Sequence, residues 1–378
     1  MKFASGHKTT ATTATTALVV VCIVHAITYT PMPVMSLSTK SSRQTSSSSS
    51  KTRASNELPK PYGTATVDYS AANEYLDEQY EDKIPNPYFP HDQATERIYD
   101  GRSEDPTLES RGFQLTPMAT PDVRDWNNKE QLRAEYLPIL RDFFTRTYGE
   151  ENIKHLFFYN PMARGEEMGV SQSDLESHEL PSSPTQTRCH LDNDWSASNL
   201  DRVVGLVHKQ TLDYYDNKDG FPRQELERAI QEGHRYMVIN CWRNTDPHHV
   251  IQRAPLGVYA TQYADSRRVF PLSRPDFDRS RWYVFPHMTA DECLMFKQFD
   301  RDDRYIGDIW HCALHSLRVP EEQDEDDDNR DSKPPRRSFD VRAFLVLKDK
   351  VDSDHDRYGP NRLEPKYKTA QEHQDATS

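Results

Sequence analysis

A mainly β fold with flanking helices is predicted for residues 58–350 of this 378-residue chain. Between about residues 235 and 347, short segments rich in β-branched and aromatic residues alternate with turn residues, as in "RYMVINCWRN" and "RSFDVRAFLVL". Helical patterns lie before them, and no long linker divides the region. Strands that follow a group of helices in this way are typical of a β-sandwich or barrel with helices packed outside, so we expect one domain.

The first half of this region supplies the helices and the first strands. "KEQLRAEYLPILRDFFTRTYG" (129–149) repeats apolar residues at helical spacing and ends at a glycine, and two further helices are predicted at 199–213 and 223–234. "ERIYDGRS" and "RGFQLTPM" predict two short strands in a hairpin or meander, and "IKHLFFYNPMAR" predicts a buried strand. The helices are expected to support the β region from outside.

Both ends of the chain and one internal segment are predicted to be disordered. Residues 1–57 are rich in serine and threonine, 318–335 are strongly acidic, and 351–378 lack an apolar pattern. The apolar run 17–27 is short for a bilayer span, and a secretory signal or an uncleaved anchor is the first interpretation. An organelle transit peptide and an unprocessed tail stay open, so the compartment does too. Membrane association through this run is expected only if the signal is not cleaved.

The composition excludes some classes of function. A net charge of −13 and a pI near 5.6 argue against a protein that grips phosphate backbones. The five cysteines are widely spread and include no C-x-x-C pair, so neither a zinc ribbon nor a disulfide scaffold is implied. We therefore expect no nucleic-acid partner.

His190 and Asp192, in "TRCHLDNDWS", are the first candidates for a metal site. Residues two apart on a strand point to the same face, so this imidazole and carboxylate can reach one cation. A second histidine from a distant strand would complete a two-His-one-carboxylate triad, which suits non-haem Fe(II). "IWHCALHSLRV" offers His311 and His315 for that position. The spacing alone is weak evidence, because the polar tail repeats it.

The last predicted strand carries groups that would bind a dicarboxylate. In "RRSFDVRAFLVL" one face is apolar and the other carries Arg336, Ser338, Asp340 and Arg342. A guanidinium binds a carboxylate with two parallel hydrogen bonds, and a hydroxyl adds a third. A metal triad beside such a clamp is the arrangement of a 2-oxoglutarate-dependent oxygenase. The alternative is that the arginines only keep an edge strand soluble.

Several blocks of sequence, taken in order, resemble a hydroxylase/desaturase family of Fe(II)/2-oxoglutarate oxygenase-like proteins. Its members include gibberellin desaturase-like and cephamycin methoxylation protein-like enzymes. The blocks are "HLDND", "RYMVINCWRN", "APLGVYATQYADSR", "RWYVFPHMTADECLMFKQFD", "WHCALHS" and "RRSFDVRAFLVL", and the likeness covers about residues 95–347. The resemblance implies a double-stranded β-helix (jelly-roll) core and the cofactors Fe(II), 2-oxoglutarate and O2. It also implies hydroxylation or desaturation of a small-molecule substrate, such as a secondary metabolite.

Block by block, the resemblance implies roles for particular residues. His190 and Asp192 would be the first two iron ligands, and His311 the third in preference to His315. The Arg-x-Ser clamp for 2-oxoglutarate would be Arg336 with Ser338, while Arg342 stays open as the principal clamp. The residues that would line the pocket or support the fold are Asn240, Trp242, Arg243 and Lys297.

Two departures and three alternatives qualify this expectation. The chain has Asn244 where the family usually has proline, and the acidic segment 318–335 is longer than expected between triad and clamp. A zinc-dependent hydrolase could use the same ligands with a general base. A jelly-roll binding protein without activity and a partner subunit that assists another oxygenase are the other two alternatives. The sequence leaves the oligomeric state open.

Overall fold

The computed structural model describes residues 60–72, 92–165, 182–192, 200–214, 218–260, 281–320 and 333–356. They all belong to the unit Glu57–Ser378, one of two into which the chain divides. The predictions for residues 1–57, and for most of the acidic segment and of the tail, lie outside these ranges. None of the helices in the described ranges is both long and apolar enough to cross a membrane.

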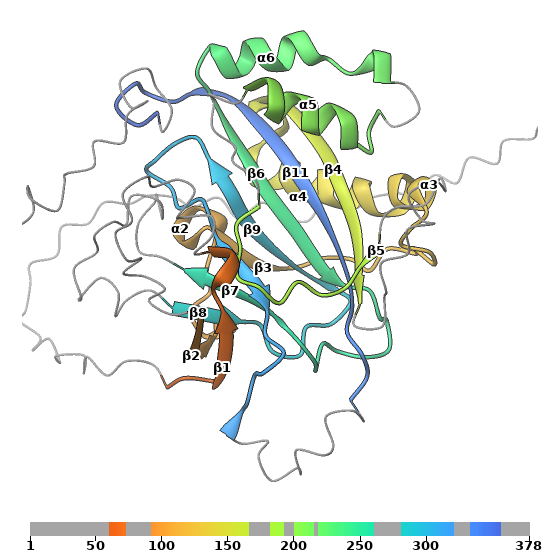
Figure 1. Cartoon of the computed structure of the whole chain (residues 1–378). Helices are drawn as coiled ribbons and strands as arrows, with labels where there is room; N and C mark the ends of the chain where they lie inside the picture. The colour runs from red at the N-terminus through yellow and green to blue at the C-terminus, as the bar shows by residue number, and fades with distance from the viewer. Residues whose placement is uncertain are drawn as a thin grey trace, which may run out of the picture. The chain divides into compact units, whose positions relative to one another are not determined.

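Two β-sheets form the body of this unit (Figure 1). One has five strands in the order β1-β2-β8-β7-β10, and the other has six in the order β3-β9-β6-β11-β4-β5. The strands are β1 (Gly63–Asp68), β2 (Gln93–Asp100), β3 (Phe113–Pro117), β4 (Ile153–Gly165), β5 (Ser182–Ser183), β6 (His234–Asn244), β7 (Leu256–Ala260), β8 (Arg281–Val284), β9 (Glu292–Asp300), β10 (Trp310–Ala313) and β11 (Arg337–Lys350). Most neighbours are antiparallel, whereas β2 with β8 and β4 with β5 are parallel pairs.

The order in which the chain visits the two sheets defines the fold class. From β6 in the six-stranded sheet it passes to β7 and β8 in the five-stranded sheet, returns to β9, crosses to β10 and returns to β11. This winding between two sheets is that of a double-stranded β-helix, or jelly roll. The predicted class, mainly β with flanking helices around a jelly-roll core, is confirmed.

Helices pack on the six-stranded sheet from both sides (Figure 1). They are α2 (Leu108–Arg111), α3 (Lys129–Gln131), the π-helical η2 (Leu132–Tyr136), α4 (Leu137–Tyr148), α5 (Leu200–Gln210) and α6 (Arg223–Gln231), with 3-10 turns η1 (Gly101–Ser103), η3 (Glu150–Asn152) and η6 (Lys218–Gly220). Alternation along β11 explains both contacts, because Phe339 and Val341 pack with α4 while Phe344 and Val346 pack with α5 and α6. The predicted helices are confirmed, the first as three consecutive helical segments.

The first strands differ from the sequence prediction. β2 and β3 do not form a hairpin, because β2 lies beside β8 in one sheet and β3 lies beside β9 in the other. Helix α2 lies between these two strands in the chain. Strand β1 is an unpredicted element that pairs with β2 along its whole length. Its short alternation of Ala65 and Val67 with threonines gave too weak a pattern to stand out from the polar segment before it.

The folded region continues beyond residue 350, the predicted end of the domain. Val351 is buried, and Asp356 pairs with the guanidinium of Arg301 at 2.6 Å. The charged residues of 352–356 have the composition of a solvated tail, but a buried ion pair holds this segment against the sheet. The domain boundary therefore has to be moved to Asp356 or beyond.

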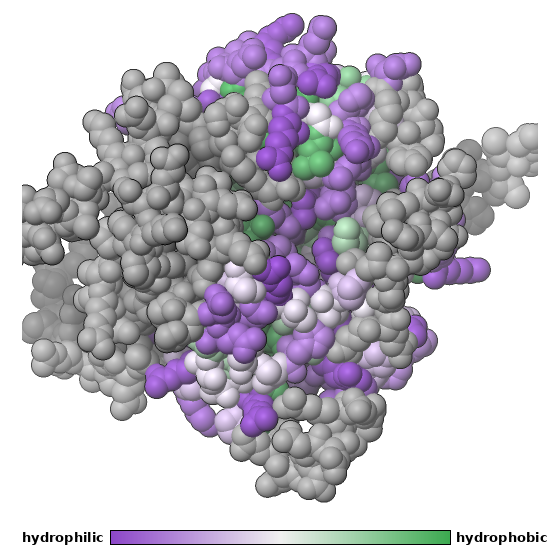
Figure 2. Space-filling view, viewed as in Figure 1, coloured by the Kyte–Doolittle hydropathy of each residue, from purple (hydrophilic) through white to green (hydrophobic). Residues whose placement is uncertain are grey.

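Apolar side chains of the described residues gather in buried clusters. On the face seen in Figure 2, hydrophilic residues predominate among the described ones, with small hydrophobic areas between them. Several polar side chains are buried as well, among them Asn240, His311, Arg336 and Arg342. Buried polar groups are more informative about function than exposed ones.

Candidate metal centre

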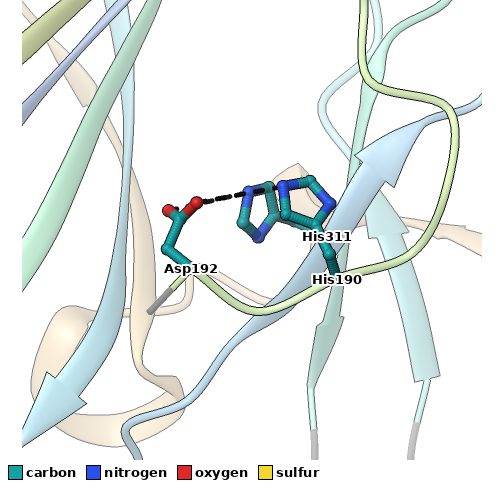
Figure 3. A group of neighbouring side chains, drawn as sticks. All are labelled: His190, Asp192 and His311. Atoms are coloured by element: carbon teal, nitrogen blue, oxygen red, sulfur yellow. Dashed lines mark ion pairs between the residues drawn. The ribbon is translucent and has the colours of Figure 1, made fainter. Parts of the chain in front are cut away.

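The predicted ligands His190, Asp192 and His311 lie together in the core of the jelly roll (Figure 3). His190 and His311 form an antiparallel bridge in which each backbone N–H donates to the other's carbonyl, at 3.2 and 3.1 Å. His311 lies on β10, whereas His190 and Asp192 belong to the segment that follows β5. Two segments far apart in the sequence thus bring two imidazoles and one carboxylate to the same point.

The candidate ligand atoms are close enough to share one cation. Nε2 of His190 lies 3.9 Å from Oδ1 of Asp192, and Nε2 of His311 lies 4.0 Å from Oδ2. The centres of the two imidazole rings are 4.3 Å apart. One ligand atom from each residue lies within 4.8 Å of the other two, and no second group of this kind occurs among the described residues.

Hydrogen bonds decide which nitrogen of each imidazole faces the site. Nδ1 of His190 lies 2.9 Å from the carbonyl oxygen of Arg188, and Nδ1 of His311 lies 3.2 Å from that of Ile309. A carbonyl only accepts, so each Nδ1 carries the donated proton and Nε2 is the nitrogen of each ring that faces the site. Burial, together with repulsion from His190, lowers the pKa of His311 to about 3 against the attraction of Asp192. His311 is therefore neutral near pH 7, which is the form that binds metals.

Asp192 is held on both carboxylate oxygens and on its backbone. Arg342 on β11 lies with Nη2 2.6 Å from Oδ1, and Asn240 on β6 donates from Nδ2 to Oδ2 at 2.8 Å. The backbone N–H of Asp192 donates to Oε1 of Gln298 at 2.8 Å. Burial raises the pKa of Asp192, but the positive charge of Arg342, followed by the two histidines, outweighs burial and brings it well below its ordinary value. The carboxylate is therefore ionised near neutral pH.

One pocket contains the three candidate ligands and Arg336 of the predicted clamp. Arg336, immediately before β11, lies with Nε 3.2 Å from Oγ of Ser338 and donates from Nη1 to the carbonyl of Ala254 at 2.5 Å. Its guanidinium carbon is 5.1 Å from the ring centre of Trp242. The other lining residues are Arg164, Gln186, Asn240, Leu256, Phe296, Asp340 and Arg342. Arg336 and Ser338 are both buried and not on an exposed edge, but only Arg336 lines the pocket, and Ser338 contacts its guanidinium.

Only two of the four residues predicted to line the pocket or support the fold reach the pocket. Asn240 and Trp242 line it from β6. Arg243 and Lys297 are not among the described residues that line it, because neighbouring residues on a strand face opposite sides of the sheet. Lys297 is fully buried and pairs with Asp300 at 2.7 Å. Arg243 donates to the backbone carbonyls of Ala119 and Ala290.

The structure adds one supporting residue, Gln298, that the sequence analysis does not identify. Gln298 on β9 accepts from the backbone of Asp192 and donates to the carbonyl of Ile309 at 3.1 Å, so it ties both ligand segments together. Its sequence signal is weak but present, since it is the polar residue two positions after Phe296 on the pocket face of "ECLMFKQFD". His315, the rejected third ligand, lies with Nε2 2.8 Å from the hydroxyl of Thr185.

The donor set fits ferrous iron. Two imidazoles and one carboxylate form the two-His-one-carboxylate pattern, which leaves coordination positions open for other ligands. A structural zinc site instead closes the metal within four protein ligands. The hydrogen bonds behind each imidazole and each carboxylate oxygen are the contacts that usually orient metal ligands.

Fold and site together define a jelly-roll protein with a candidate metal centre. Its three protein donors would leave positions on the metal open for further ligands. The chain belongs to the family described as an oxidoreductase/YMDC permease-like domain, whose model matches residues 61–346. The matched region contains the three candidate ligands and the clamp, and it agrees with the predicted resemblance to an oxidoreductase family. No curated protein sequence matches the chain.

The solved structures similar to the chain include three of the iron and alpha-ketoglutarate-dependent endoperoxidase NvfI. The first is 17% identical with a TM-score of 0.45, over 67% of this chain and 86% of that chain. A second structure, in a different conformation, is 17% identical with a TM-score of 0.43, over 70% of this chain and 91% of that chain. A structure of a variant is 17% identical with a TM-score of 0.45, over 76% of this chain and 98% of that chain. At this level of similarity, function has to be inferred from the side chains of the site itself.

Proposed function

We propose that the chain is an Fe(II)- and 2-oxoglutarate-dependent oxygenase that hydroxylates or desaturates a small molecule. The observation that carries the proposal is the meeting, in one buried pocket, of the His190, Asp192 and His311 donors with Arg336. A metal triad alone would suit several reactions, and a buried arginine alone would suit any anion. Their combination fits a 2-oxoacid that reaches the metal at one end and a guanidinium at the other.

Each group in the pocket has a role under this proposal. His190, Asp192 and His311 would hold Fe(II) through two Nε2 atoms and the carboxylate. When bound, iron and 2-oxoglutarate supply the activation of O2 that oxidises an unactivated C–H bond. Arg336 would bind the distal carboxylate of 2-oxoglutarate, with Ser338 holding the guanidinium at 3.2 Å. Arg342 is engaged by Asp192, which favours Arg336 as the principal clamp.

The pocket also affects the environment of the reaction. The lining by Trp242, Leu256 and Phe296 limits contact with water around the donors. Whether a substrate is hydroxylated or desaturated depends on which of its carbons faces the metal. The acidic net charge of the chain continues to argue against a nucleic-acid substrate.

The proposal is tested by metal and co-substrate binding without oxygen. Purified protein, mixed anaerobically with Fe(II) and 2-oxoglutarate, should develop a weak visible charge-transfer absorption. His190→Ala and Asp192→Ala should abolish this absorption, because each removes one donor. His315→Ala is the matched control and should keep it, since His315 bonds to Thr185 outside the donor group.

A second measurement separates this function from its rivals. In air and without substrate, the wild-type protein should convert some 2-oxoglutarate to succinate and CO2. A protein that binds stoichiometric zinc and leaves 2-oxoglutarate intact would instead favour a hydrolase. A protein that neither binds iron nor consumes 2-oxoglutarate would rule out the proposal.

A further inference from the structure

A buried cation lies directly against the candidate metal ligand Asp192. Nη2 of Arg342 is 2.6 Å from Oδ1, and both side chains are only 8% exposed. Water therefore screens this pair less than an exposed pair, so the charge of Arg342 also acts on a cation that Asp192 binds.

Arg342 is anchored on its other side by an irregularity in β4. The pairing of β11 with β4 shifts its register between Asp340 and Arg342. Asn160 lies at this bulge with a φ of 50°, a left-handed conformation that asparagine tolerates better than most residues. With its amide oxygen turned toward β11, Asn160 accepts from Nη1 and Nη2 of Arg342 at 3.2 and 3.3 Å. The guanidinium of Arg342 thus contacts Asp192 on one side and Asn160 on the other.

The residues that line the pocket include one more arginine than carboxylate, so the lining carries an excess of positive charge before a metal binds. Asp192 is matched by Arg342 and Asp340 is matched by Arg164 at 2.6 Å, and Arg336 is the third arginine of this lining. A divalent metal adds two positive charges beside this excess and beside the buried cation of Arg342. A dianionic ligand that binds both the metal and Arg336 would cancel those two added charges.

We propose that Arg342 is a positioning residue that makes metal binding depend on a dianionic co-substrate. Its charge opposes a lone divalent cation at His190, Asp192 and His311, and this opposition is relieved when the dianion arrives. Metal and co-substrate therefore bind as a coupled pair, each raising the affinity for the other by the same factor. The inference rests on the proposed function for the identity of the dianion, 2-oxoglutarate.

The test measures Mn²⁺ affinity with and without 2-oxoglutarate, using the full chain. The electron paramagnetic resonance signal of free Mn²⁺ reports the unbound ion, and Mn²⁺ with 2-oxoglutarate under argon gives no turnover. In the wild type, 2-oxoglutarate should tighten Mn²⁺ binding at least tenfold. In Arg342→Gln, measured at about pH 8 so that a proton does not compete for Asp192, binding without 2-oxoglutarate should tighten about tenfold, because both the repulsion and the competing ion pair are lost. The effect of 2-oxoglutarate should shrink accordingly.

Two control variants separate charge from geometry. Arg342→Lys keeps the charge and should keep the wild-type coupling. Arg164→Gln removes a cation that is paired with Asp340, which is not a candidate ligand, and should change Mn²⁺ affinity less than Arg342→Gln does. Weaker Mn²⁺ binding in Arg342→Gln would overturn the proposal, as would equal behaviour of the lysine and glutamine variants.

The wild type alone keeps the inference testable if Arg342→Gln does not fold. Mn²⁺ affinity that is indifferent to 2-oxoglutarate would overturn the coupling. Results that refute the coupling differ from results that refute the proposed function. If the wild type shows no Mn²⁺ binding that is lost in His311→Ala, the metal centre itself is refuted. Tight Mn²⁺ binding that does not respond to 2-oxoglutarate would refute only the role of Arg342.

Discussion

At the residue scale, a hydrogen bond behind each candidate ligand decides what that ligand offers to a metal. The Nδ1–H groups of His190 and His311 donate to backbone carbonyls, which hold the rings with Nε2 toward Asp192. Buried Asp192 would tend to take up a proton, but the charge of Arg342 keeps it ionised. The donors are therefore oriented beforehand, which lowers the cost of binding.

Replacement of Arg336 by alanine tests the clamp at the same scale. The 2-oxoglutarate concentration for half-maximal charge-transfer absorption should rise about hundredfold, since charge-assisted hydrogen bonds of this kind contribute ~2–3 kcal/mol. Arg337→Ala is the matched control, because Arg337 is the next residue in the chain, at the start of β11, and is exposed. An equal loss in both variants would contradict a specific role for Arg336.

At the scale of elements, a buried charge network joins β9 to β6 behind the pocket. Asp300 at the end of β9 pairs with Lys297 at 2.7 Å and with Arg235 of β6 at 2.6 Å. Burial raises the pKa of Asp300, but its attraction to Lys297 and Arg235 outweighs burial and lowers it. Because the folded-state pKa lies below the unfolded value, this stabilisation is present above the ordinary carboxyl pKa. It is lost as the pH falls through the folded-state value.

Asp300→Asn should lower the free energy of unfolding by about 3 kcal/mol at pH 7, because two buried cations lose their buried carboxylate and keep only the more exposed carboxylate of Glu109. Urea unfolding at pH 7 and in strong acid measures the effect, which should be smaller in acid. Asp142→Asn, in the exposed pair with Arg146, is the control and should cost less than about 0.5 kcal/mol. A similar cost for both variants would show that the network adds nothing special.

Strand alternation explains why much of the pocket could be predicted from the sequence. The pattern of β11 separates Phe339 and Val341, which face the helices, from Ser338 and Arg342, which do not. The same period places His190 and Asp192 on one side of their segment. Period-2 patterns are local, so they can be found without knowing which strands pair.

Features that depend on pairing between distant strands could not be predicted in this way. The bulge at Asn160 exists only in the register between β4 and β11, and Gln298 gains its role from a contact across the sheets. β2 and β3 are neighbours in sequence, yet they join different sheets. Local patterns do not contain the register that decides these contacts.

At the scale of the whole molecule, a bound metal would link segments that are far apart in the chain. His190 and Asp192 precede α5, whereas His311 follows β9. Mn²⁺ with 2-oxoglutarate should therefore raise Tm, with about 2.7 kcal/mol of stabilisation at a hundredfold excess over Kd. Differential scanning fluorimetry measures this. His311→Ala should abolish the increase and His315→Ala should retain it; equal increases in both would place the metal elsewhere.

The C-terminal segment closes the fold at the same scale. Arg301, 5% exposed at the end of β9, depends on Asp356 for its charge partner, and the backbone of Val351 donates to the carbonyl of Gly233 at 2.9 Å. A chain ending at residue 350 loses both contacts, whereas one ending at residue 356 keeps them. We expect the shorter chain to be less stable by about 3 kcal/mol, because removing Asp356 leaves a buried guanidinium without its carboxylate. Urea unfolding of the two truncated chains gives the difference directly. Equal stability would mean that Arg301 finds compensation elsewhere and that the domain ends at 350 as the sequence predicts.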